Sequence, residues 1–429
     1  MNILLTGASG FIGRHILRAL EQQNHKVTAC CRNAEKLFFK SADTRIVRLD
    51  YAAVSCDSDW LPYLQNIDAV INCVGIIAES PGQTFHRLHA QVPASLFRAA
   101  ERAGIKKIIQ ISALGADACA HSAYHLSKKA ADDTLRNLDL DWYVLQPSIV
   151  YGDGAQSMAL FQALAALPMQ PVIDGGRQLL QPVHVSDVAD TVLQCLKAEA
   201  PARLTLPLVG PSPIDFGQLL QQLRRRLGKK PAPTISLPGN LVQRFVFIGR
   251  WLGEPVCNAD NIAMLQRGNT ADAGPVEAFL GRATHSLEQR LLPQPASQAE
   301  RWHAGLYFLR PLLRLSIAFL WLWSGIVSLF FYPHEQSYRF LSATGVTGIA
   351  APITLYGLAL LDIALGLATL AAYRPRRLIL IQLILVLLYT LTVGIALPEF
   401  WLHPFGPVLK NVPLLITLLV YLHLEGERP

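Results

Sequence analysis

Short, nearly continuous apolar runs alternate with longer amphipathic stretches over the first 150 residues. The apolar runs predict strands at residues 2–6, 26–30, 69–73, 107–111 and 142–145. The stretches between them have helical spacing and predict helices at residues 11–23, 85–103 and 124–137. Strands that alternate with helices form right-handed βαβ units, and strands that are apolar throughout are covered on both faces. The pattern therefore predicts an α/β fold, with a Rossmann-type doubly wound parallel sheet over residues 1–150.

Charged residues disappear from long segments near the C-terminus. Residues 315–332, 340–361 and 378–397 carry no Asp, Glu, Lys or Arg, and each is close to the roughly 20 residues that a spanning helix needs. Residues 408–424 form a shorter apolar stretch with Lys410 near its start. The pattern predicts a C-terminal all-α transmembrane bundle of four helices over residues 308–425. Three spans with one interfacial helix are the alternative.

The segment between these two regions is less regular. Residues 151–295 are interpreted as a small substrate lobe whose strands and helices return to the Rossmann core. Within it, residues 175–181 predict a loop over the active site, and the prolines of residues 229–240 predict a linker or strand–turn. A polar, glutamine-rich stretch at residues 293–300 marks a domain boundary.

The composition favours a soluble part joined to a membrane part. Only 16% of the 429 residues are charged, against about 25% in typical soluble domains. No signal peptide precedes the first predicted strand, so the N-terminal domain is expected to fold in the cytoplasm. Arginines precede the first span and separate the second from the third. By the positive-inside rule they predict a multi-pass protein of the cytoplasmic (inner) membrane with both termini in the cytoplasm; they are Arg310, Arg314, Arg374, Arg376 and Arg377.

The cysteines and the net charge point away from metal and nucleic acid. The seven cysteines form no Cys-x-x-Cys pair and no cysteine–histidine metal spacing, so we expect reduced thiols and no metal. The net charge is +7, but the basic cluster at residues 224–230 has no interleaved aromatic residues for base stacking. We interpret this cluster as a solvated helix face, with anionic lipid headgroups as the alternative contact. No nucleic-acid partner is expected.

A glycine-rich turn follows the first predicted strand directly. Gly7 allows the sharp turn, Gly10 lets the backbone approach a pyrophosphate, and Gly13 lets the helix lie close to the strand. The free N–H groups of the first helical turn then face the anion. The predicted cofactor contacts in this turn are Gly7, Ser9, Gly10, Phe11, Ile12 and Gly13.

Further candidate residues fall at the C-terminal ends of the predicted strands, where parallel sheets bind ligands. Arg32 follows the second strand, and a guanidinium there favours a 2′-phosphate, so NADP is preferred and NAD is the alternative. Asp50 is expected to reach the adenine edge, with capping of a loop as the alternative. Asn72, Val74 and Gly75 end the next strand, and Gly75 lets the backbone pass near the cofactor.

Tyr124 and Lys128 form the candidate catalytic pair. They are four residues apart on a predicted helix, so they point the same way. A nearby ammonium is expected to lower the phenol pKa from its usual value of about 10, so that Tyr124 exchanges a proton with a carbonyl or alcohol oxygen. Ser112, at a strand end, is expected to hold the same oxygen, and Lys128 also to hold the cofactor ribose. The alternative is an exposed aromatic beside a solvated lysine.

Together these motifs resemble the extended or atypical short-chain dehydrogenases/reductases (SDRs), an epimerase/dehydratase-like group. The matching pieces span residues 1–295 and are residues 6–13, 72–75, Ser112, Tyr124 with Lys128, residues 146–152 and residues 182–189. Residues 70–152 are especially similar to the branch that contains the SDR-like accessory subunit of respiratory complex I. The resemblance implies a Rossmann fold, NADP(H) binding with Pro147 among the contacts, and a substrate lobe after Tyr151. His184 and Asp187 match a family motif near the lobe, and His184 is interpreted as a packing histidine.

The C-terminal region resembles the small four-helix DoxX-like membrane family in hydropathy and size. Asp362 lies among its apolar residues, where a carboxylate costs a few kcal/mol unless it faces a partner or water. It is therefore a candidate functional residue, with a helix–helix hydrogen bond as an equal alternative.

Two functions follow from these features. The first is a membrane-anchored NAD(P)(H)-dependent SDR oxidoreductase that acts on a carbonyl or alcohol of a lipid-soluble molecule, such as a quinone or isoprenoid. The second is a non-catalytic nucleotide-binding accessory or assembly protein of a membrane redox complex. The expected partners are the lipid bilayer and a small hydrophobic substrate, and in the second case that redox complex.

Overall fold

The computed structural model describes residues 1–37, 41–244 and 259–426. They form two compact units, Met1–Gly305 and Leu306–Pro429, which are described separately here. Residues 245–258 of the predicted substrate lobe, including Cys257, lie outside the described residues.

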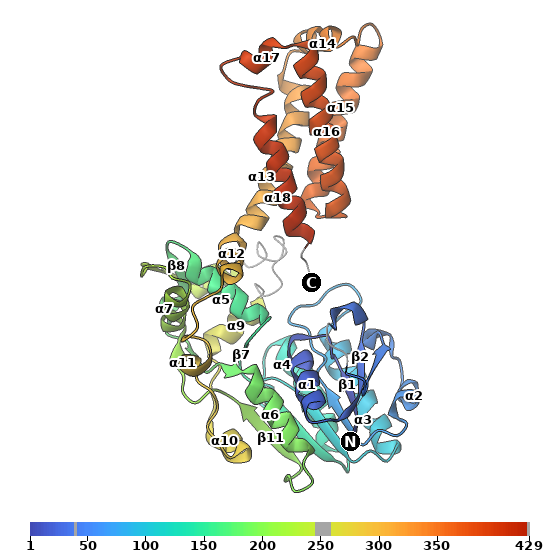
Figure 1. The fold of residues 1–429 in the computed structure, drawn as a ribbon, viewed down its shortest axis with the longest axis vertical. Coiled ribbons are helices and arrows are strands. Elements are labelled where there is room, and N and C mark those ends of the chain that lie inside the picture. Colours follow the sequence, from blue (N-terminus) through green and yellow to red (C-terminus); the bar gives the residue numbers. More distant parts are fainter. Residues whose placement is uncertain (38–40, 245–258, 427–429) are drawn as a thin grey trace. The chain divides into compact units, whose positions relative to one another are not determined.

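A seven-stranded parallel sheet forms the centre of the first unit (Figure 1). Its spatial order is β11 (Leu204–Leu208), β6 (Asp141–Pro147), β5 (Lys107–Ile111), β4 (Ala69–Asn72), β1 (Asn2–Thr6), β2 (Lys26–Cys31) and β3 (Thr44–Arg48). Every neighbouring pair is parallel. The chain order reverses between β1 and β4, and the C-terminal ends of these strands form the crevice where such sheets bind ligands. The predicted Rossmann-type α/β fold is confirmed.

Helices cover both faces of this sheet, as its apolar strands require. One face is covered by α1 (Phe11–Gln22) and α6 (Val185–Leu196). The other is covered by α3 (Val92–Arg102) and α4 (Ala123–Arg136). The short elements on the edges of this domain are η1 (Ala34–Lys36), η2 (Tyr51–Ala53), η3 (Asp57–Trp60) and α2 (Leu61–Leu64).

The predicted helix at residues 85–103 is present, but its first part is a π-helix rather than an α-helix. It begins with a π-turn, η4 (His86–Gln91), and α3 follows, with the Val92 N–H bonded to the Arg87 carbonyl five residues earlier. Pro93 has no N–H to donate to the carbonyl four residues before it, which removes one α-helical hydrogen bond at this point.

The substrate-lobe residues build a separate small core around Tyr151, Phe161 and Leu220, against which Phe11 packs. Its elements are β7 (Val150–Tyr151), α5 (Gln156–Ala166), β8 (Gln170–Ile173), η5 (Asp174–Gly176), β9 (Leu179–Leu180), β10 (Val183–His184), β12 (Ile214–Asp215), α7 (Phe216–Arg226), β13 (Thr234–Leu237), α9 (Ala259–Arg267), α10 (Gly274–Leu280), α11 (Leu287–Arg290) and α12 (Gln298–Leu306). Strands β7 and β10 pair in parallel, as do β8 and β13, whereas β9 and β12 are antiparallel.

The prediction of a solvated basic helix face is wrong for two of its three arginines. Arg224 is buried and its guanidinium donates to the carbonyls of Ala165 (2.8 Å) and Leu167 (2.6 Å), at the end of α5. Arg226 donates to the Leu291 carbonyl at 3.0 Å. The last carbonyls of a helix have no partner within the helix, so an arginine beside them donates its hydrogen bonds to these carbonyls instead of to water.

Four apolar helices form the core of the second unit: α13 (Leu309–Ile326), α15 (Ala350–Leu370), α16 (Pro375–Ala396) and α18 (Asn411–Gly426). The π-turn η6 (Val327–Phe331) extends α13, and α17 (Glu399–Leu402) is a short connection. Among the described residues, three helices are long and apolar enough to cross a membrane, and α18 is shorter. The helical membrane region is confirmed, and four crossings stay a prediction.

The predicted bounds of the second span are wrong. Helix α15 begins at Ala350, and the preceding α14 (His334–Ala343) is a separate helix. Gly345 and Gly348 lie between them with φ values of 88° and 61°, and this left-handed backbone ends one helix before the next begins. Asp362 of α15 is buried and accepts a 2.9 Å hydrogen bond from the Ser324 hydroxyl of α13, which agrees with the helix–helix alternative.

Candidate functional site

The glycine turn between β1 and α1 packs directly on the loop that follows β4. Gly7 has a φ of 72°, and a Cβ on it would lie 2.9 Å from the Cys73 carbonyl oxygen. A Cβ on Gly13 would lie 2.1 Å from the Gly7 carbonyl oxygen. Gly10 is the N-cap of α1 and has no side chain to occupy the first N–H groups. The turn therefore fits a dinucleotide diphosphate, which needs close backbone approach and open amides.

The other residues predicted in this turn divide by side-chain direction. Phe11 packs against the lobe core, and Ile12 packs against the core of the sheet. Ser9 is half-buried. Contact with a diphosphate would therefore come from the backbone N–H groups of Phe11 and Ile12 rather than from their side chains.

Two arginines lie at the C-terminal ends of β2 and β3. Arg32 is exposed directly after β2, and Arg48 ends β3 in register with Cys31. Sequence reasoning missed Arg48 because the register of β3 against β2 was not known. Asp50 caps η2, accepting a 3.2 Å hydrogen bond from the Ala52 N–H, as in the capping alternative.

Asn72 lies inside the sheet, where its side chain is fully buried. Its Oδ1 accepts hydrogen bonds from the hydroxyls of Thr6 (2.6 Å) and Tyr51 (3.0 Å), and its Nδ2 donates to Gln110 Oε1 (2.7 Å). These contacts connect β1, β4 and β5, so the amide is engaged within the protein. Cofactor contact by Asn72 stays a prediction, as does that by the buried Pro147.

Lys128 lies beside the loop after β4. Its ammonium is buried and donates to the carbonyls of Ile111 (3.1 Å) and Val74 (3.4 Å). A Cβ on Gly75 would come within 3.2 Å of Lys128 Nζ. Tyr124, one turn earlier on α4, is half-buried, and its ring meets those of Phe85 and His89 edge-on. The structure thus brings Val74, Gly75, Tyr124 and Lys128 to one end of the sheet.

Ser112 has a different partner from the one expected. Its hydroxyl donates to Asp132 Oδ2 at 2.5 Å, and both side chains are buried. A serine has one hydroxyl hydrogen, so while Asp132 accepts it Ser112 cannot donate to a substrate oxygen. Among the described contacts none joins Ser112 to Tyr124. Sequence reasoning missed Asp132, although its position four residues after Lys128 continues the same helix face.

The pKa of Tyr124 shifts in the direction opposite to the one expected. Burial raises the pKa of Tyr124 to about 12, and the charge of Asp132 adds to this. Burial lowers the pKa of Lys128 to about 8, against the attraction of Asp132 and Cys73. Burial raises the pKa of Asp132 to about 6, which the Ser112 hydrogen bond opposes. Tyr124 is therefore a neutral phenol near pH 7.

The lowered pKa of Lys128 predicts a pH dependence of NADPH binding. The ammonium is present below pH 8 and is lost as the pH rises through about 8. If it holds the ribose, NADPH affinity falls over that interval, by about tenfold for one charged hydrogen bond. Fluorescence titration from pH 6.5 to 9.5 measures this, and Lys128→Met is expected to bind more weakly with no such step. If the Lys128→Met variant showed an equal fall in NADPH affinity over this pH interval, the pH dependence would belong to another group.

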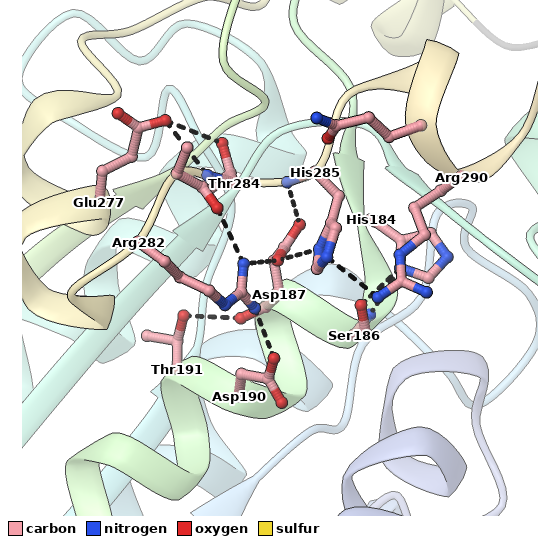
Figure 2. Close-up of polar contacts among 12 residues, drawn as sticks. His184, Ser186, Asp187, Asp190, Thr191, Glu277, Arg282, Thr284, His285 and Arg290 are labelled. Atoms are coloured by element: carbon pink, nitrogen blue, oxygen red, sulfur yellow. Dashed lines mark hydrogen bonds and ion pairs between the residues drawn. The ribbon is translucent and has the colours of Figure 1, made fainter.

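A second polar cluster joins the C-terminal segment of the first unit to α6 (Figure 2). Asp187 is buried and accepts from Arg282 (2.8 Å), the His285 backbone N–H (2.9 Å) and His285 Nδ1 (2.7 Å). Arg290 donates to His285 Nε2, so His285 carries its proton on Nδ1. His184 caps α6 with its ring and packs on Tyr151, which agrees with a packing role. The cluster is a cross-link between segments about 95 residues apart.

Comparison with known proteins agrees with this division of the chain. Residues 7–199 match the NAD(P)H-binding family and residues 318–419 match the DoxX-like family. The chain is 26% identical over 238 residues to the ceramide reductase of Caulobacter vibrioides (55% of this chain, 73% of that one). It is 28% identical over 302 residues to the photosystem II assembly factor Ycf39 of a Synechocystis species (68% and 90%). It is 24% identical over 269 residues to subunit 9 of the alpha subcomplex of the rat mitochondrial NADH dehydrogenase (60% and 69%).

Solved structures share the fold of the first unit. MoeE5 bound to UDP-glucuronic acid and NAD has a TM-score of 0.54 at 21% identity, covering 68% of this chain and 97% of that one. UDP-glucuronic acid 4-epimerase from Bacillus cereus has a TM-score of 0.54 at 18% identity, covering 72% and 100%. The first unit is thus an NAD(P)-binding Rossmann domain of the SDR-like type. The protein combines this domain with a C-terminal DoxX-like domain of membrane helices.

Proposed function

We propose that the protein is a membrane-anchored NADP(H)-dependent reductase acting on the carbonyl of a lipid-soluble molecule. The observation that carries this is the position of Tyr124 and Lys128 on one face of α4, with the Lys128 ammonium beside Gly75 in the loop after β4. The ceramide reductase relative supports a substrate with a long apolar part. The apolar helices of the second unit also support a lipid-soluble substrate, because a water-soluble substrate needs no membrane anchor.

Each residue has a separate task in this proposal. Bound NADPH would lie with its diphosphate on the glycine turn and supply the hydride to the carbonyl carbon. Tyr124 gives its phenolic proton to the carbonyl oxygen, which becomes the alcohol. Lys128 holds the ribose and favours the phenolate that remains, and solvent then returns the proton. Asp132 holds Ser112 and contributes charge near Lys128, so it sets the local electrostatics without touching the substrate.

Turnover by the full chain in lipid nanodiscs tests the reductase directly. NADPH oxidation is followed with a panel of membrane-soluble carbonyls: a long-chain aliphatic ketone, an isoprenoid quinone and a ketone derived from a ceramide. We expect one class to be reduced with matching loss of NADPH and gain of alcohol. NADPH binding without oxidation in the presence of any of them would contradict the reductase.

Arg32 is expected to select NADPH over NADH. Arg32→Glu places a carboxylate where a 2′-phosphate would lie, so the NADPH dissociation constant should rise by about tenfold or more, whereas that for NADH should not rise. Arg45→Glu is the matched control, because Arg45 is exposed and lies earlier on β3. Calorimetric titration with both coenzymes distinguishes the results, and equal weakening of both would remove Arg32 from the phosphate site.

A nucleotide-binding assembly function is the second candidate. It is favoured by the resemblance to Ycf39 and to the NADH dehydrogenase subunit, and by the hydrogen bond that occupies Ser112. In that case the bound nucleotide stabilises the first unit by mass action instead of reacting. Co-purification of a membrane complex that is lost when Gly13 is substituted, but kept in Tyr124→Phe, is the expected result for this candidate.

A further inference from the structure

His89 is a buried polar side chain that the proposed reaction does not use. It lies in the π-turn η4 and is fully buried. π-turns are rare and occur frequently at functional sites. Here the turn places His89 between the loop after β4 and the first turn of α4, the two segments that hold Gly75 and Tyr124.

The hydrogen bonds of His89 determine its protonation. Its Nε2 accepts the Ile76 N–H at 2.9 Å, so the ring hydrogen is on Nδ1, which donates to the Ser127 hydroxyl at 3.1 Å. The Ser127 hydroxyl in turn donates to the Tyr124 carbonyl at 2.7 Å. Burial lowers the pKa of His89 to about 2, and the neighbouring Lys128 charge adds to this, so the ring is neutral throughout the physiological range. A continuous chain of hydrogen bonds therefore runs from Ile76 to Tyr124.

Ring contacts fix the Tyr124 side chain against the same residue. The His89 ring stacks on Phe85, with centroids 5.4 Å apart, and meets the Tyr124 ring edge-on at 5.3 Å. A Cβ on Gly75 would lie 3.7 Å from His89 Nε2 and 3.2 Å from Lys128 Nζ. His89 thus contacts the Ile76 backbone next to Gly75 on one side and the Tyr124 ring on the other.

We propose that His89 is a positioning residue that holds the Tyr124 ring and the Gly75–Ile76 backbone in one fixed geometry for proton donation. This inference rests on the proposed reductase function. A small displacement of a reacting group costs rate more than it costs binding, because the reaction needs alignment within fractions of an ångström. His89 would therefore affect kcat, with little effect on the affinity for NADPH.

A double-mutant cycle with Tyr124 tests this. His89→Phe keeps an aromatic ring but removes both hydrogen bonds, and kcat should fall by about 10- to 100-fold with KM and NADPH affinity unchanged. In the Tyr124→Phe background the same substitution should have no further effect, because His89 acts through Tyr124. His89→Gln supplies an acceptor and a donor but no ring, so it should recover the part of the rate that depends on the hydrogen bonds. Equal losses in both backgrounds, or no recovery with His89→Gln, would overturn the proposal.

A measurement without turnover separates this proposal from the reductase itself. 3-Fluorotyrosine at position 124 gives a single 19F resonance that should shift in His89→Phe and move back toward its wild-type position in His89→Gln. Ser127→Ala, which removes only the linking hydroxyl, should shift it in the same direction and covers the case in which His89→Phe does not fold. An unmoved resonance in the variants that fold rejects the positioning role. If instead Tyr124→Phe leaves turnover intact, the reductase mechanism fails, whatever the resonance does.

Discussion

Tyr124→Phe is expected to lower kcat for NADPH-dependent carbonyl reduction by about 100- to 10,000-fold, the usual contribution of a general acid. The phenol is the proposed proton donor, and its pKa, raised to about 12 by burial, keeps it protonated at neutral pH. Phenylalanine retains the ring contacts with Phe85 and His89, so the fold and the NADPH affinity should not change. Stopped-flow NADPH oxidation under single-turnover conditions measures the chemical step.

The matched control for this result is Tyr63→Phe. Tyr63 lies on α2, its ring packs on Trp60, and it belongs to the cluster on the α3 and α4 face of the sheet. Loss of its hydroxyl should leave the rate unchanged. A Tyr124→Phe enzyme that reduces its substrate at the wild-type rate would show that the proton comes from another group or from water. A protein that binds NADPH without turnover in any form would favour the assembly function.

The Rossmann part of the fold could be predicted because its signals are local. Strand β1, the glycine turn and α1 are consecutive in the chain, and their order alone defines a dinucleotide turn. Tyr124 and Lys128 are likewise one helical turn apart, so their common face follows from periodicity. Neither inference needs to know which distant segments meet.

The parts that could not be predicted depend on long-range contacts. The hydrogen bond between Ser112 and Asp132 crosses from a strand end to a helix, and it changes the availability of the serine hydroxyl. Three adjacent arginines cannot be told apart from the sequence alone. Arg224 is nevertheless buried, because the end of α5 packs beside it. The direction of the Tyr124 pKa shift also depended on such contacts, because burial of the phenol and the nearby charge of Asp132 both raise its pKa.

Gly13→Ala is expected to weaken NADPH binding by about 100-fold while leaving the remaining sheet intact. A Cβ at this position would lie 2.1 Å from the Gly7 carbonyl oxygen. This oxygen is a backbone atom, so it cannot rotate away as a side chain could. Either α1 or the turn must shift, at a cost of about 1–3 kcal/mol in the free energy of unfolding. The shift withdraws the first N–H groups of α1, and loss of one or two charge-assisted hydrogen bonds raises the dissociation constant about 100-fold.

Gly305→Ala is the control for the glycine substitution itself. Gly305 lies on α12 with open space around its Cβ position and no positive φ, so alanine should be tolerated with unchanged NADPH affinity. Calorimetry with NADPH and a thermal unfolding curve for both variants separate binding from stability. Excess NADPH should raise the unfolding temperature of the wild type and of Gly305→Ala but not that of Gly13→Ala, because a ligand stabilises only the form that binds it. Wild-type affinity in Gly13→Ala would mean that the diphosphate does not lie on this turn, and the cofactor site would have to be sought elsewhere on the sheet.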